Sequence, residues 1–141
     1  MKHFFLIFHF FVFIGKVFSQ DLVFSSDPEN LGKNINSQYG ELHPTISPDG
    51  RILYFTRDDH PENTTTEDQD IWFSVNSEGQ WSPAKNISSP LNNKGNNSVC
   101  GITPDNNLML LIGKYNYYDG SMSSGVSIST RDARGWVFTK A

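Results

Sequence analysis

The apolar positions of residues 20–141 fall in short runs, and no long amphipathic stretch occurs. No segment keeps an apolar period of 3.6 residues over three turns, as a surface helix requires. Apolar, aromatic and β-branched runs recur instead, separated by Gly, Asn, Pro, Ser and Asp, which is an all-β pattern. The expected strands are Thr45–Ser47, Ile52–Thr56, Asp70–Ser74, Trp81–Pro83, Val99–Thr103, Leu108–Gly113, Gly125–Thr130 and Trp136–Thr139.

This pattern occurs twice along the chain. The stretch ISPDGRILYF begins at residue 46, and ITPDNNLMLL begins 56 positions later, at residue 102. Gly79 and Gly135 are also 56 apart, whereas Trp81 and Trp136 are 55 apart, so one deletion separates the units. A period of this length with about four strands per unit is typical of a β-propeller blade. We therefore expect two antiparallel four-stranded blades, which is an incomplete propeller.

Each unit is expected to contain a hairpin with a tight turn. Asp49-Gly50 favours such a turn because Gly adopts positive φ without a Cβ clash. Asn106 can take the same conformation, because Asn tolerates the left-handed region. Asp70 opens a strand and is expected to bond to backbone groups. The residues assigned to turns, packing or capping are Pro48, Asp49, Gly50, Asp70, Trp72, Gly79, Trp81, Pro104, Asp105, Gly135 and Trp136.

The motifs resemble the WD-like β-propeller repeat of TolB type, and most closely its version in exported envelope proteins of gram-negative bacteria. That version often accompanies an OmpA-like peptidoglycan-binding domain. In the second unit Asn106 replaces the turn Gly, and GVSIS replaces the expected Asp-Ile-aromatic segment. The resemblance covers residues 30–141, and it implies a fold without fixing an activity. It rests on INSQYGELHPTISPDGRILYFTR, QDIWFSV, EGQWSPAKNI and PLNNKGNNSVCGITPDNNLMLLIGK.

The N-terminal residues predict export. A basic start, an apolar run, and Val17 and Ser19 before Gln20 indicate a cleaved signal peptide; an uncleaved membrane anchor is the alternative. Two blades cannot close a ring, so we expect a fragment of a longer protein, an assembly between chains, or open sheets. The expected divisions are a signal peptide (1–19), a lead-in segment (20–38), blade 1 (39–94) and an incomplete or divergent blade 2 (95–141).

Charge and cysteine content limit the partners. Removal of Lys2 and Lys16 with the leader leaves nine basic and fifteen acidic side chains, a net charge of −6. Nucleic acid is therefore not expected as a partner, because phosphate binding needs a basic face. Cys100 is the single cysteine, which excludes an internal disulfide, and its apolar neighbours predict a small buried side chain.

The sequence offers few candidates for chemistry. Residues 57–70 are rich in Asp and Glu but match no calcium loop, and no phosphate-binding loop or nucleophile elbow occurs. We interpret that loop as solvated, and we expect no metal, cofactor or catalytic residue. His43 could reach a ligand, because the resemblance places it near the channel or upper face of a propeller. Tyr115, Tyr117 and Tyr118 could stack on a sugar or peptide, with packing or assembly as the alternative.

The leading hypothesis is a non-enzymatic, exported module that binds or scaffolds a protein or an envelope component. We expect it in the periplasm or at the outer membrane, and secretion is an alternative. Exposed blade edges can also recruit another blade and so allow self-association. The alternative function is the N-terminal propeller part of a larger exported hydrolase, a peptidase or glycosidase, whose catalytic domain lies beyond this sequence.

Overall fold

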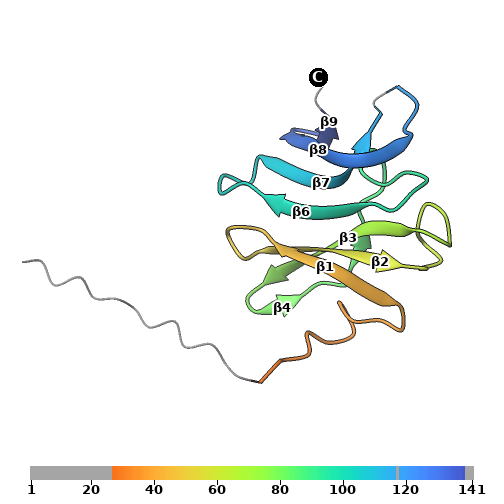
Figure 1. Cartoon of the computed structure of the whole chain (residues 1–141). Helices are drawn as coiled ribbons and strands as arrows, with labels where there is room; N and C mark the ends of the chain where they lie inside the picture. Colours follow the sequence, from red (N-terminus) through yellow and green to blue (C-terminus); the bar gives the residue numbers. More distant parts are fainter. Residues whose placement is uncertain (1–26, 117, 139–141) are drawn as a thin grey trace, which may run out of the picture.

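The computed structural model describes residues 27–116 and 118–138, which form two antiparallel β-sheets (Figure 1). The described residues contain no helix, and therefore no helix that is long and apolar enough to cross a membrane. The predicted signal peptide lies outside the described residues. Sheet 1 has the order β1 (Gly40–Ile46), β2 (Ile52–Asp58), β3 (Gln69–Ser77) and β4 (Gln80–Trp81), with β5 (Lys85–Asn86) also paired to β3. Sheet 2 has the order β6 (Ser98–Ile102), β7 (Leu108–Tyr115), β8 (Met122–Asp132) and β9 (Gly135–Phe138).

The all-β class is confirmed, and each predicted strand overlaps an observed one. The largest difference in length is at β8, which is longer than the predicted Gly125–Thr130. The predicted strand Trp81–Pro83 is also different, because pairing is interrupted there between β4 and β5. Pro83 has no backbone N–H and so cannot donate to the neighbouring strand.

The two sheets repeat the same local structure. Both first strands contain a β-bulge, between Leu42 and Thr45 in β1 and between Val99 and Gly101 in β6. Thr45 and Gly101, which end the two bulges, are 56 apart along the sequence. Farther along, the Ser74 hydroxyl donates to the Ser82 carbonyl at 2.6 Å, and the equivalent Ser129 hydroxyl donates to Val137 at 2.9 Å. The sequence repeat is therefore also a repeat of hydrogen bonds.

The hairpin turns explain why Pro-Asp recurs. The hydroxyl of Ser47 donates to Asp49 Oδ1 at 2.6 Å and accepts the Ile52 N–H at 2.8 Å. Thr103, Asp105 and Leu108 repeat these two bonds at 2.5 and 3.1 Å. Gly50 has φ of 71° and Asn106 has φ of 56°, so the predicted left-handed turn residues are confirmed. The turn carboxylates are exposed and bonded within the turn, which lowers the pKa of both Asp49 and Asp105.

The inner faces of the two sheets pack against each other. Tyr54 and Ile71 of sheet 1 meet Met109 and Leu111 of sheet 2, and Leu91 from the linker between the sheets joins them. Each of these five residues is at most 2 % exposed. Burying a side chain of this kind stabilises the fold by about 1.5–3 kcal/mol, so this layer is the main core.

The lead-in segment covers the other face of sheet 1. In Figure 1 it runs along the side of sheet 1 away from sheet 2. Ile35 packs there on Leu53, Phe55 and Trp72, and its carbonyl accepts a hydrogen bond from Arg57 at 2.8 Å. Sheet 1 is thus apolar on both faces, and the chain covers both.

A valine at position 50 tests the turn. No heavy atom lies within 4 Å of a Cβ built at Gly50, so the cost of Gly50→Val comes from positive φ rather than from a clash. We expect a loss of about 1–2 kcal/mol in the free energy of unfolding, measured by denaturant titration. Asn106→Gly is the matched control and should leave stability equal or raised. Equal stability of Gly50→Val and wild type would contradict the turn assignment.

Candidate functional site

One apolar face of the molecule is not covered by any residue that the structure describes. We call Leu110, Ile112, Val126 and Ile128 the outer face of sheet 2. Leu110 pairs with Ile128, and Ile112 pairs with Val126, so all four side chains lie on one side of the sheet. They are 38 %, 41 %, 62 % and 46 % exposed, whereas Met109, on the opposite side, is fully buried.

The repeat shows what this face corresponds to. Leu110 is equivalent to Tyr54, at a separation of 56 residues, and Val126 is equivalent to Ile71, at a separation of 55. Tyr54 and Ile71 are buried against sheet 2. Sheet 2 therefore presents to solvent the same face that sheet 1 buries. A group of exposed apolar side chains on one sheet face is typical of an interaction surface.

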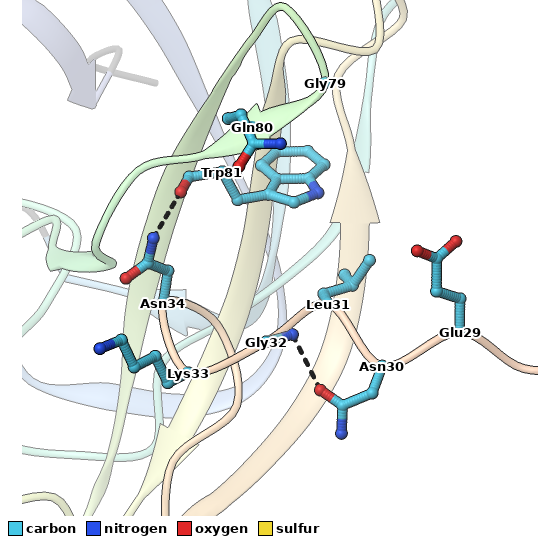
Figure 2. Close-up of a pocket in the computed structure, with 9 residues that line it drawn as sticks. All are labelled: Glu29, Asn30, Leu31, Gly32, Lys33, Asn34, Gly79, Gln80 and Trp81. Atoms are coloured by element: carbon cyan, nitrogen blue, oxygen red, sulfur yellow. Dashed lines mark hydrogen bonds between the residues drawn. The ribbon is translucent and has the colours of Figure 1, made fainter.

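A polar cleft lies at the opposite end of the molecule, beside sheet 1. Its volume is about 410 Å³, and Figure 2 shows Trp81 on one side of it and residues 29–34 of the lead-in segment on the other. The Asn34 amide donates to the Trp81 carbonyl at 2.7 Å, and the Gly32 N–H donates to Asn30 Oδ1 at 2.8 Å. These bonds fix the lead-in segment against the β3–β4 hairpin, so the cleft is bounded by two anchored segments.

A second hollow of about 280 Å³ lies on the same side of sheet 1. Leu31 and Glu29 line both cavities. The second hollow is more apolar, because the sheet contributes Leu53 and Phe55 to its floor. Its remaining lining residues are Ile35, Asn36, Glu41, Leu42 and Pro44. The lead-in segment therefore leaves space over an apolar sheet face.

Many residues of the acidic loop are exposed, but the prediction of a solvated loop was wrong for Asp68. Asp68 is 5 % exposed because Thr65 donates to its Oδ2 and Asn63 bonds to its backbone. Asp70 is fully buried; its Oδ2 accepts the Thr64 N–H at 2.7 Å, as predicted, and the Asn86 amide at 2.8 Å. Burial raises the pKa of Asp70, and these donors partly oppose the shift.

His60 belongs to the same packed region. Its ring lies between Tyr39 and Trp72, with ring centroids 4.7 and 4.5 Å away. Burial lowers the pKa of His60, and the Arg57 guanidinium adds to the effect. Among the described residues no three His, Cys, Asp or Glu side chains lie close enough to hold a metal ion. The region fixes the loop to sheet 1, and its bonds are structural.

The predicted ligand-binding residues lie in different environments. His43 is exposed in the β1 bulge, with φ of 49°. Tyr115 is half-buried: its hydroxyl donates to the Leu91 carbonyl at 2.9 Å and accepts from the Asn97 amide at 2.8 Å. Tyr118 is 88 % exposed, and Tyr117 lies outside the described residues. The inward position of Tyr115 separates it from the surface that Tyr118 occupies.

Cys100 is exposed, so the prediction of a buried side chain was wrong. The apolar residues beside it suggested burial, but it is the extra residue of the β6 bulge, which removes it from the alternation of the strand. Its Sγ lies 3.5 Å from the Leu110 carbonyl oxygen, next to the outer face of sheet 2.

The tryptophans act in packing, as predicted. Trp72 is 2 % exposed, and its Nε1 donates to Asn63 at 3.0 Å. Trp136 packs on the core between the sheets and donates to the Tyr54 hydroxyl at 3.2 Å. Trp81 packs beside Ile35 and stays half-buried at the cleft. Sequence reasoning missed the outer face of sheet 2, although the alternation of Leu110, Ile112, Val126 and Ile128 was a signal for it.

No protein-family model and no curated protein matches the chain.

The phenol of Tyr115 gives a pH-dependent test of the core. Burial raises the pKa of Tyr115 to about 12, whereas an unfolded tyrosine titrates near pH 10. Because the folded pKa is the higher one, this contribution to stability is complete below pH ~10 and is lost as pH rises through ~12. We expect Tyr115→Phe to be about 1–2 kcal/mol less stable at neutral pH, with the difference narrowing between pH ~10 and ~12. The measurement is the free energy of unfolding against pH.

Tyr118→Phe is the control for removing a phenol, because Tyr118 is 88 % exposed. At neutral pH its free energy of unfolding should lie within about 0.5 kcal/mol of wild type. A constant difference between wild type and Tyr115→Phe up to pH ~12 would contradict the buried, hydrogen-bonded position of this phenol.

Proposed function

We propose that the chain is a non-enzymatic module that binds another protein through the outer face of sheet 2. The observation that carries the proposal is the exposure of Leu110, Ile112, Val126 and Ile128 on a face that corresponds to the buried inner face of sheet 1. Covering apolar surface is worth about 25 cal/mol per Å², so a partner that fits this face gains affinity from it. The partner is a protein or a proteinaceous component of the cell envelope.

The use of the motif residues supports a non-catalytic role. Asp49 and Asp105 hold turns, Asp70 holds a loop, and Trp72 and Trp136 pack in the interior. Each of these side chains is already engaged in the fold, as a structural repeat requires. A scaffold of this kind binds through its surface and needs no reactive group.

We further propose that the two sheets are blades of a TolB-type β-propeller repeat. The matching bulges, the matching turn hydrogen bonds and the left-handed Gly50 and Asn106 support this assignment. The leader of residues 1–19 supports export, to the periplasm or the outer membrane. The net charge of the processed chain favours a partner other than nucleic acid. Pairing through exposed strand edges is a further, weaker route to self-association.

Site-specific photo-crosslinking in the exporting cell tests the binding surface. A photoreactive residue at Val126 or Ile128 should form a discrete protein adduct, because both side chains are exposed on the outer face of sheet 2. The same probe at Ser77, exposed at the end of β3 in sheet 1, is the control and should not form that adduct. The protein in the adduct is identified by mass spectrometry.

Binding of the identified protein to the purified chain is then measured by calorimetry. Val126→Asp should weaken it by at least about tenfold, because an unpaired carboxylate against an apolar partner costs more than about 1.4 kcal/mol. Ser77→Asp should leave the affinity unchanged. Adducts that are the same from all three positions, or equal affinities of both variants, would contradict the proposal.

A further inference from the structure

The outer face of sheet 2 and the outer side of sheet 1 lie at opposite ends of the molecule. In the repeat, they correspond to the two sides of the interface between sheet 1 and sheet 2. Within the chain, the inner face of sheet 1 packs against the inner face of sheet 2 and the linker before it. The outer face of sheet 2 corresponds to the inner face of sheet 1, because Leu110, Val126 and Ile128 are equivalent to Tyr54, Ile71 and Phe73.

The outer side of sheet 1 corresponds to the inner face of sheet 2 and the linker before it. Ile35 is equivalent to Leu91, and Leu53 to Met109, at separations of 56 residues. Leu91 and Met109 are buried between the sheets, at 1 % and 0 % exposure. Ile35 and Leu53 form the corresponding layer on the outer side of sheet 1.

Part of that layer is open. Leu31 is 43 % exposed and Ile46 is 55 % exposed, whereas their equivalents Ile87 and Ile102 are packed against the core between the sheets. The hollow of about 280 Å³ beside Leu31 has an apolar floor. The lead-in segment stands where the linker with Leu91 stands in the internal interface, so it does not have to move for a sheet to pack on it.

From this we infer that the partner of the outer face of sheet 2 includes a second copy of this chain, which docks head to tail with the outer side of its sheet 1. This inference rests on the proposed function and names one partner for the same surface. The contact reproduces between copies the packing that joins sheet 1 to sheet 2 within one copy. Because its two sides differ, it is a heterologous contact, which generates a ring or an open array.

Because the two sides of the contact differ, a substitution on one side should leave the other side able to bind. Val126→Asp removes the sheet 2 side of the contact and keeps the sheet 1 side. Leu31→Asp does the reverse. Each variant alone should have the molar mass of a single chain in light scattering, whereas wild type should increase in mass with concentration. An equimolar mixture of the two variants should form a dimer and nothing larger, because each chain keeps one competent face.

A control variant, two further variants and a test of folding accompany this experiment. Ser77→Asp places the same charge at an exposed strand position of sheet 1 and should associate like wild type. Ile128→Lys and Ile46→Asp repeat the two disruptions at other residues of the same faces, both exposed in one copy. Circular dichroism and cooperative unfolding confirm that each variant is folded.

The inference is overturned if wild type keeps the mass of a single chain at every concentration. It is also overturned if Leu31→Asp associates like wild type, because that result indicates two sheet 2 faces packed on each other. In either case a different protein captured at Val126 would still support the proposed function. Failure of both this association and that capture would reject the proposed function as well.

Discussion

A β-sheet with apolar side chains on both faces has to be covered on both sides, and the rest of this structure depends on that constraint. In sheet 1, Tyr54 and Phe55 are neighbours on β2, and each is 2 % exposed, on opposite faces. Sheet 2 covers the first face, and the lead-in segment with Ile35 covers the second. Sheet 2 has the same two-faced pattern, but the side chains of its outer face stay 38–62 % exposed. The function we propose follows from this asymmetry.

The hydrogen bonds of the turns keep the two sheets alike despite different side chains. Ser47 and Thr103 each bond to an Asp two residues later and to the strand that follows. The core side chains differ more, since Ile35 corresponds to Leu91 and Phe55 to Leu111. Sequence identity is therefore highest where backbone geometry requires it, and packing tolerates changes of apolar residue.

Much of the fold could be predicted from the sequence, because its signals are local. Short apolar and β-branched runs located the strands, Asp49-Gly50 located a hairpin, and the spacing of Gly79 and Gly135 showed the repeat. Positions that depend on contacts between distant segments could not be predicted. Cys100 is exposed because of a bulge, Asp68 is buried by its own loop, and Tyr115 turns inward to bond Leu91 and Asn97. The alternation of apolar residues in β7 and β8 is visible in the sequence, but which side of sheet 2 stays exposed depends on how the two sheets pack.

The most direct test of the central idea, that the outer face of sheet 2 is an interface, uses the single native thiol beside it. The rate at which a maleimide modifies Cys100 is measured as a function of protein concentration. We expect the rate to fall as the concentration rises, because docking covers the β6–β7 region next to Leu110. Val126→Asp should abolish this dependence. A wild-type rate that is the same at all concentrations, with and without the identified partner, would show that the outer face of sheet 2 is not an interface.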